Sequence, residues 1–442
     1  MFSSLQQSLS GLELELKDND LYQDTIDEFS ELNSTLNNLS KRVNSLQSIK
    51  KILELYNCTN NVSGLFSLLA SEIIINICLY LPAKDLMMLA MTNKSLNCIC
   101  KDKFLWFKLV NQQEFTVTIP RWAWDKITDH PVNIYQKRAK VLQNWSNKIS
   151  NCKTFRDHTN QVSAIKLNNG IMISVGFDKK INVYVVNKNW KLHKVKSNTN
   201  HTDRILCVDL NSTQFVTGSR DESVKLWDLQ TLTNLHTFSD HTDNVWSVQF
   251  YENCIFSGGS DKRVNVYDIR TKALIHTINN LHERGISMIK VQDNKIYTSS
   301  ADGTIKIVDI RTYNTLTHLN HNSKELYGFD ILDNTLVAGG NDVLLYYDLQ
   351  TGQLKHSLTD YGLIYGIKIF KHKIITVGDS DRNHKYIKIL NHDLTKSKYT
   401  TFDNTNNNVM HSNTVRGIWS DEYSMITCSG DNTVKVWDFG TF

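Results

Sequence analysis

The sequence predicts a mainly β fold: a seven-bladed β-propeller formed by residues 151–442, preceded by a small all-α region and an N-terminal helical segment. Three observations predict this fold. A unit of roughly 40 residues recurs along the C-terminal two-thirds of the chain. Each unit divides into four short alternating strands separated by Gly, Asp and Asn turns. A His and an Asp also recur at one fixed spacing.

Each unit ends in a strand whose closing position is aromatic or apolar. The closing residues are Tyr184, Trp227, Tyr267, Val308, Tyr347, Leu390 and Trp437. In five units a His precedes the turn Asp by twenty residues; the pairs are His158 and Asp178, His201 and Asp221, His241 and Asp261, His282 and Asp302, and His411 and Asp431. The fifth unit offers His321 with Asn341 or Asp342, whereas the sixth has Tyr361 twenty residues before Asp381. We therefore expect the sixth unit to depart most from the regular geometry.

The last unit lacks a fourth strand, because the sequence ends four residues after Trp437-Asp438. An unpaired strand edge is an aggregation hazard. The segment 151–158 matches the fourth strand of the other units, yet it precedes the first unit. We therefore expect residues 153–155 to pair with the C-terminal strand and to close the ring.

The repeated His, Asp and closing aromatic resemble the WD-repeat family, although only Trp227 and Trp437 keep the literal Trp-Asp dipeptide. Five units also carry a hydroxyl ten residues before the closing position, namely Ser174, Thr217, Ser257, Thr298 and Thr427. A hydrolase triad needs one such set beside an oxyanion hole, not a copy in each repeat. We interpret the sets as buried hydrogen-bond networks and predict no catalytic residues and no enzyme.

Composition excludes several other classes of protein. The formal net charge of +4, from 49 basic and 45 acidic residues, gives no argument for nucleic acid, and no apolar run is long enough for a membrane span. The eight cysteines show no CxxC spacing, so we expect no disulfide frame, no metal and no cofactor. Because the N-terminus does not look like a secretory signal, we expect a protein of the cytoplasm or the nucleus.

A helical module is expected over residues 65–109, where Pro82 separates a first apolar helix from a second that Asp85 caps. Further features of this module are Glu72-Ile73, Tyr80-Leu81, Lys84-Asp85-Leu86, Thr92-Asn93-Lys94 and Leu105-Trp106. They resemble an F-box, which docks on the Skp adaptor of a cullin–RING ubiquitin ligase; Ala70 stands where that family usually has proline. The resemblance implies that the adaptor binds at Leu69, Ile73, Ile77, Leu81, Leu86 and Trp106.

The alternative for this module is a helical spacer with its own core. A unit of about 45 residues rarely stabilises itself. Surplus apolar surface on so small a unit is best explained by a partner that covers it. The sequence therefore favours the adaptor-binding interpretation.

The expected organisation has four parts, with boundaries at 1–63, 64–110, 111–150 and 151–442. Residues 135–145 resemble the linker helix of F-box/WD proteins. The N-terminal part carries a short seam of apolar residues at alternating spacings of three and four. We expect this helix either to form a homodimer through residues 29–53 or to fold back on its own F-box.

The resemblance also implies which face of the propeller binds a target. In phosphate-reading F-box/WD proteins, arginines stand just before the turn Asp and five residues after the repeat His, where this sequence has Arg220 and Arg416. Related loop positions hold Arg204, Trp246, Tyr327 and Tyr365. Arginine pairs bidentately with phosphate or carboxylate, and aromatic residues provide rigid contact area. The alternative is that these arginines are simply solvated.

Together these features predict a non-catalytic substrate receptor of an F-box ubiquitin ligase. It binds a Skp-type adaptor, and through it a cullin–RING ligase, and it captures a target protein or phosphopeptide on the propeller. The alternative is a coiled-coil/WD-repeat scaffold that assembles complexes without ubiquitin ligation. The module at residues 65–109 distinguishes the two functions, whereas the sequence does not identify the target.

Overall fold

The structure, a computed structural model, describes isolated positions between residues 75 and 90 and most of the chain beyond them. The continuous described ranges are 94–110, 130–147, 150–186, 192–320, 324–370, 373–379, 385–391, 400–402 and 410–440. The chain divides into two compact units, Met1–Leu105 and Trp106–Phe442. The expected N-terminal helix with its apolar seam lies outside the described residues.

Two short helices follow the isolated positions. These are α7 (Lys94–Cys100) and α8 (Lys103–Val110), of which α8 begins in the first unit and ends in the second. Asp102 caps α8, because its Oδ1 accepts a hydrogen bond from Leu105 N at 3.2 Å. Helix α7 thus covers Lys94 of the expected Thr92-Asn93-Lys94 feature, and α8 covers Leu105-Trp106.

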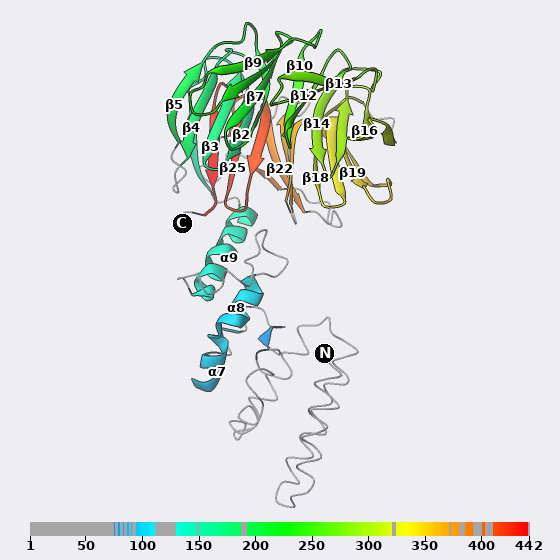
Figure 1. The fold of residues 1–442 in the computed structure, drawn as a ribbon. Coiled ribbons are helices and arrows are strands. Elements are labelled where there is room, and N and C mark those ends of the chain that lie inside the picture. The colour runs from blue at the N-terminus through cyan, green and yellow to red at the C-terminus, as the bar shows by residue number, and fades with distance from the viewer. Residues whose placement is uncertain are drawn as a thin grey trace, which may run out of the picture. The chain divides into compact units, whose positions relative to one another are not determined.

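The second unit contains α9 (Pro131–Asn147) and a ring of antiparallel sheets (Figure 1). Four of the sheets have four strands in chain order. The first two comprise β2 (Val162–Asn168), β3 (Ile171–Gly176), β4 (Ile181–Val186) and β5 (Leu192–Asn198), and β6 (Ile205–Leu210), β7 (Gln214–Ser219), β8 (Val224–Asp228) and β9 (Asn234–Phe238). The next two comprise β10 (Val245–Tyr251), β11 (Cys254–Gly259), β12 (Val264–Asp268) and β13 (Ala273–Ile278), and β14 (Ile286–Gln292), β15 (Lys295–Ser300), β16 (Thr304–Asp309) and β17 (Thr315–Asn320).

The described strands form six sheets, so the expected number of seven blades is wrong. The strands of the expected fifth and sixth units share one sheet of β18 (Leu326–Leu332), β19 (Thr335–Asp348), β20 (Leu354–Phe370), β21 (Lys373–Asp379), β22 (Lys385–Asn391) and β23 (Thr400–Phe402). β20 runs straight through the point where the regular units break for their His-containing loop, because Tyr361 stands there instead. Backbone pairing of Asn341 with Leu363 then carries the sheet across the junction.

The last sheet closes the ring, as expected. It combines β24 (Val415–Ser420), β25 (Ser424–Ser429) and β26 (Val434–Asp438) with β1 (Asn151–Phe155) from the start of the propeller. Lys153 pairs with Val436, and Phe155 pairs with Val434, in antiparallel register. The C-terminal strand therefore has no open edge.

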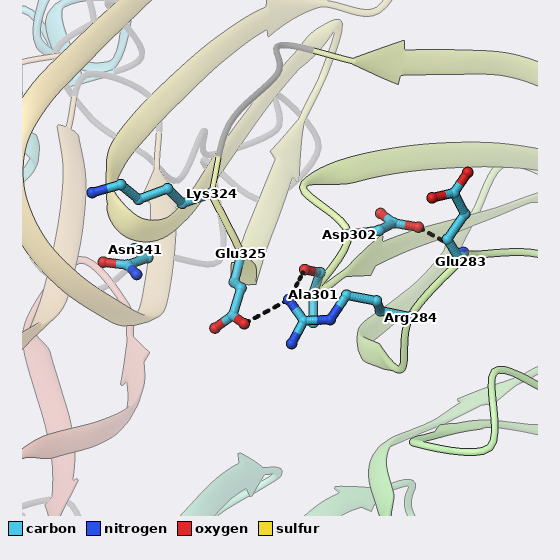
Figure 2. Close-up of a pocket in the computed structure, with 7 residues that line it drawn as sticks. All are labelled: Glu283, Arg284, Ala301, Asp302, Lys324, Glu325 and Asn341. Carbon is cyan, nitrogen blue, oxygen red and sulfur yellow. Dashed lines mark hydrogen bonds and ion pairs between the residues drawn. The ribbon is translucent and has the colours of Figure 1, made fainter.

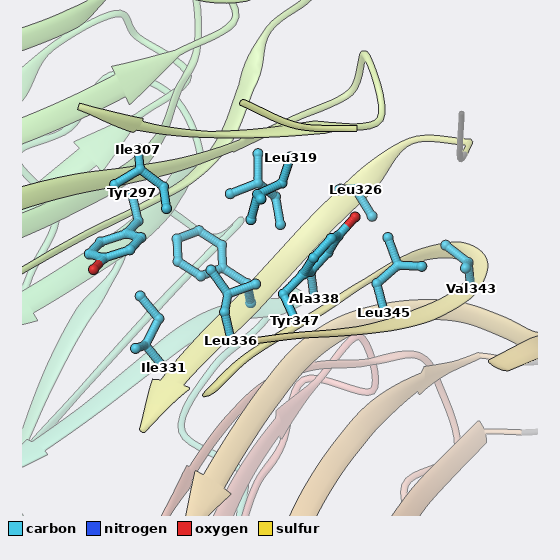
Figure 3. Packing of buried hydrophobic residues seen from close by; sticks show 12 residues of the cluster. Tyr297, Ile307, Leu319, Leu326, Ile331, Leu336, Ala338, Val343, Leu345 and Tyr347 are labelled. Carbon is cyan, nitrogen blue, oxygen red and sulfur yellow. The ribbon is translucent and has the colours of Figure 1, made fainter. Parts of the chain in front are cut away.

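The hydrophobic core lies between neighbouring blades. In the cluster of Figure 3, Tyr297 and Ile307 of the fourth blade face Leu336 and Tyr347 of the following sheet. The first strands of the units contact one another in a closed cycle, in the order β2, β6, β10, β14, β18, β20 and β24. Alternating apolar residues thus bury both faces of each sheet, and the loops at the strand ends are left to form surfaces.

A tight turn joins the second and third strands of each regular unit. The residue after the turn Asp has a positive φ: Lys179 at 64°, Glu222 at 67°, Lys262 at 65°, Gly303 at 82° and Asn432 at 67°. Only glycine adopts this conformation without steric cost. The turn Asp offsets this steric cost by accepting hydrogen bonds from the backbone of the turn. Asp221 Oδ1, for example, accepts one from Ser223 N at 3.1 Å.

The helix α9 packs on the last sheet. Trp145 donates from Nε1 to Glu422 O at 2.9 Å, and its ring stacks on Phe439 with centroids 3.7 Å apart. Arg138 Nη1 donates to Val110 O, the last residue of α8, at 3.2 Å, and Arg138 Nε lies 3.7 Å from Glu422 Oε1. The expected linker helix is therefore present, and a buried arginine connects it to the propeller and to the end of α8.

Candidate functional site

Five units each bury a His that bridges an Asp and a hydroxyl. In the second blade, His201 Nδ1 lies 2.8 Å from Asp221 Oδ2, and His201 Nε2 lies 2.7 Å from Thr217 Oγ1. The indole of Trp227 donates to the same Thr217 oxygen at 2.8 Å. The predicted pairs of the other four units, His158–Asp178, His241–Asp261, His282–Asp302 and His411–Asp431, lie at distances from 2.8 to 3.0 Å. The predicted networks are confirmed.

The electrostatics of these sets suit a structural role. Burial lowers the pKa of His282 to about 4, against the pull of Asp302. Burial opposes ionisation of Asp221, yet the hydrogen bonds from His201 and Ser223 hold its pKa below the usual range. A neutral His protonated on Nδ1 donates to the Asp and accepts the hydroxyl proton at Nε2, so each group is paired. These hydroxyls are fully buried and give a substrate no access.

The predicted target-binding residues lie in loops and strand ends on one face of the propeller, which we call the rim. The rim carries a second group of residues, the arginine–phenylalanine cluster: Phe177, Arg204, Tyr365 and Arg416. The guanidinium carbons of Arg204 and Arg416 lie 4.7 and 5.1 Å from the centroid of the same Phe177 ring. Arg416 also lies 5.6 Å from the centroid of the Tyr365 ring. These are cation–π distances. Closure of the ring thus brings together residues from the first, second, sixth and last units.

Contacts continue from Tyr365 along the rim. Its ring stacks on Tyr327, with centroids 5.5 Å apart and planes 23° apart. Tyr327 donates its hydroxyl proton to Glu325 Oε2 at 2.6 Å, and Glu325 Oε1 lies 2.7 Å from Arg284 Nη1. Three of the predicted rim residues (Arg416, Tyr365 and Tyr327) therefore form one continuous series of contacts.

A groove of about 450 Å³ lies at the end of this series (Figure 2). It is lined by Glu283, Arg284, Ala301, Asp302, Lys324, Glu325 and Asn341. The Arg284 side chain reaches across to Ala301, where Nη1 donates to the carbonyl oxygen at 2.9 Å, and to Glu325. The lining carries charges of both signs, which makes it a polar groove without a dominant charge.

Two predicted rim residues are held differently. Arg220 Nε lies 3.8 Å from Asp203 Oδ2, in a pair whose side chains are 51% and 43% exposed. A pair this exposed contributes little to stability. Trp246 is 42% exposed and donates from Nε1 to Ser260 Oγ at 2.7 Å. The structure therefore ties Arg220 and Trp246 to their own loops, apart from the arginine–phenylalanine cluster.

Sequence reasoning missed Phe177, Arg284 and Glu325. Phe177 stands just before the turn Asp178, in the position that singled out Arg220 in the next unit. A comparison of this position in all units would have identified Phe177. No comparable rule gives Arg284, whose role depends on a neighbouring blade.

The predicted adaptor-binding residues are only partly described. Leu69, Ile73, Ile77 and Leu81 lie outside the described residues. Leu86 is fully buried. Trp106 is 2% exposed, and its ring packs edge-on against Tyr135 of α9 at 5.4 Å. The part of Trp106 in adaptor binding remains a prediction.

No group of three or more His, Cys, Asp or Glu side chains in the described part of the chain could hold a metal ion. No described helix is long and apolar enough to cross a membrane. The seven described cysteines are free thiols.

Comparison with known proteins identifies both regions. The family model described as F-box-like matches residues 71–112. The model described as WD domain, G-beta repeat matches residues 192–228, 232–268 and 404–438. A search of curated proteins gives no match.

Proposed function

Because this chain is an F-box/WD-repeat protein, we propose that it is the non-catalytic substrate receptor of an F-box ubiquitin ligase. The F-box binds a Skp-type adaptor and, through it, a cullin–RING ligase, while the propeller rim captures the target protein. The observation that carries this proposal is the presence of both modules in one chain. The protein acts in the cytoplasm, the nucleus or both.

The rim supports capture of an anionic target. Two guanidinium groups rest on one Phe177 ring, and within the described residues neither Arg204 nor Arg416 forms an ion pair. Arg416 Nε is buried and has no hydrogen-bond acceptor there. A phosphoserine or phosphothreonine carries nearly two negative charges and three acceptor oxygens. Such a group satisfies both arginines through charge-assisted hydrogen bonds.

The contacts of α9 support transfer at a fixed distance. Ubiquitin is transferred elsewhere in the ligase, so a receptor must hold its target in a constant position. Arg138 is 4% exposed and joins α8, α9 and the turn at Glu422. Trp145 adds a stacked and hydrogen-bonded contact to the same sheet. The helix is thereby fastened to the propeller by buried groups.

Adaptor binding tests the ligase half of the proposal. The double change Leu81→Asp with Leu86→Asp places charges in the module, and Leu86 is fully buried. We expect the wild-type chain to co-purify with a Skp-type adaptor and the variant to lose it, with an unchanged propeller by circular dichroism. A wild-type chain that does not bind the adaptor favours the scaffold function.

Target capture tests the rim. We expect Arg204→Glu with Arg416→Glu to reduce target capture at least tenfold without affecting the adaptor. Arg311→Glu is the matched control, because Arg311 is also exposed but follows β16 at the opposite end of its blade. Phosphatase treatment of the target distinguishes phosphate from carboxylate. Capture that survives the double reversal places recognition on another face.

A further inference from the structure

A second group of charges lies on the first strands of the units, deeper than the rim. We call it the inner ring: Lys166 on β2, Asp209 on β6, Lys290 on β14, Asp330 on β18 and Lys368 on β20. The first strands of a propeller surround its central channel. Asp330 and Lys368 follow the rim residues Tyr327 and Tyr365 by three positions on the same strands, which places the ring about 10 Å below the rim.

The carboxylates of the inner ring are already occupied. Asp209 Oδ1 lies 2.7 Å from Lys166 Nζ, and Asp209 Oδ2 accepts a hydrogen bond from Phe250 N at 2.8 Å. Both contacts cross from one blade to the next. Asp209 therefore bridges three consecutive units, and both of its oxygens already have a donor.

Asp330 is shared between two lysines. Lys290 Nζ donates to Asp330 Oδ1, and Ile369 N donates to Asp330 Oδ2 at 2.8 Å. Lys368 Nζ lies 3.2 Å from the same Oδ2 atom. Three ammonium groups thus face two carboxylates, which leaves the ring with one surplus positive charge.

The exposed fractions of the side chains indicate whether the inner ring can bind an anion or a cation. The side chains of Lys166, Lys368 and Lys290 are 42%, 34% and 21% exposed, whereas those of Asp209 and Asp330 are each 7% exposed. Each ammonium has three donors and no acceptor. The open side of the ring therefore presents N–H donors rather than carboxylate oxygens.

The lysines also act on one another across the ring. Burial, together with the positive charges of Lys368 and Lys166, lowers the pKa of Lys290 against the pull of Asp330. An anion between these lysines would relieve that repulsion and accept their remaining donors.

We propose that the inner ring binds a small oxyanion of the phosphate or sulfate class, held by Lys166, Lys290 and Lys368. The four oxygens of such an anion can accept hydrogen bonds from lysines of different blades at once. This site is separate from the arginine–phenylalanine cluster, and it does not depend on the receptor function. Its occupant links the first, fourth and sixth units through the centre of the propeller.

Calorimetric titration of the full chain with inorganic phosphate, at constant ionic strength in chloride, tests the proposal. We expect saturable binding to the wild type and a loss of affinity of at least about tenfold in Lys368→Met, because one charge-assisted contact is removed. Lys355→Met is the matched control, since Lys355 lies on the same strand and pairs with Asp348 on the outside. Lys166→Met provides a second variant if Lys368→Met does not fold.

The rim variants separate the two anion sites. The Arg204→Glu with Arg416→Glu chain should bind inorganic phosphate at the inner ring with unchanged affinity. The proposal is overturned if the wild type shows no saturable binding, if the inner-ring variants bind as tightly as the wild type, or if only the rim variant loses phosphate.

Discussion

The second blade and the junction between the fifth and sixth units place the same pair of residue types, Thr and Lys, at equivalent strand positions but in different surroundings. Thr217 pairs with Lys225 across strands, and Thr376 pairs with Lys388 in the same way. The Thr217 hydroxyl contacts both His201 and Trp227. The Thr376 hydroxyl is buried and has no hydrogen-bond partner within the described residues. The same strand position is thus satisfied in one region and unsatisfied in the other.

Aromatic rings replace the His network at the junction. The Lys388 ammonium lies 4.0 Å from the ring centroid of Tyr361 and 4.3 Å from that of Tyr386. Tyr386 donates its hydroxyl proton to Leu363 O at 3.1 Å. These rings pack around Lys388, and β20 continues past Tyr361 without the loop that holds the His in the regular units. The units that keep the His network form separate sheets, whereas the two units that meet at Tyr361 share one. We infer that the network helps to separate one blade from the next.

The largest expected difference between the two regions is in how the free energy of unfolding depends on acid pH. The pKa of His282 falls from 6.5 to about 4 on folding, so the unfolded chain binds its proton first as the pH falls. The contribution of neutral His282 to stability is therefore fully present well above pH 6.5 and is lost as the pH falls through 6.5 toward 4. A shift of this size corresponds to about 3 kcal/mol from His282 alone, and His201 and His411 shift in the same direction.

Urea denaturation of the full chain between pH 7 and pH 4.5 measures this dependence. The non-titrating variant His282→Gln should have a shallower slope, by up to about 1.4 kcal/mol per pH unit. The junction has Tyr361 in place of the His, so it lacks this histidine titration. An unchanged slope in the variant would show that His282 does not carry the acid sensitivity.

Replacing one His tests directly how much the His network contributes to stability. His201→Leu leaves Asp221 and Thr217 without their shared partner, and we expect a loss of about 3 kcal/mol in the free energy of unfolding. His236→Leu is the matched control, because His236 lies half-buried on the outer strand of the same blade. Equal losses in the two variants would contradict a special role for the network.

The smallest effect comes from the two threonines. Thr217→Val removes a hydroxyl that serves two partners and should cost about 1–2 kcal/mol. Thr376→Val removes a hydroxyl that is buried without a partner, so it should be neutral or stabilising by up to about 1 kcal/mol. Thermal unfolding of both variants gives the comparison. A Thr376→Val chain as unstable as Thr217→Val would mean that the junction depends on that hydroxyl.

Local spacing was enough to predict the regular part of the fold. The distance between His201 and Asp221 fixes a contact inside one unit, and each unit repeats it. The closing pairing of Lys153 with Val436 could also be predicted, because the surplus strand and the missing strand match. The number of sheets could not, since the merging depends on how a segment without the His packs against its neighbour.

The candidate site could be predicted from the sequence only in part. Arg204, Arg416 and Tyr365 were singled out by position, but their common centre, Phe177, joins them only after the ring closes. Arg284 reaches Glu325 across a blade boundary, which a pattern within one repeat does not encode. Contacts between units depend on three-dimensional neighbours and therefore need the structure.

The most direct test is ubiquitylation of the proteins that the propeller captures. In a ligase reconstituted with the adaptor and the cullin–RING subunits, the wild-type chain should promote ubiquitylation of its captured target. The Arg204→Glu with Arg416→Glu chain should not promote ubiquitylation, because it does not hold the target. The Leu81→Asp with Leu86→Asp chain should hold the target but should not promote its ubiquitylation, because it does not bind the adaptor. Captured proteins that stay unmodified with the wild-type chain, or are modified equally with all three chains, would contradict the receptor function.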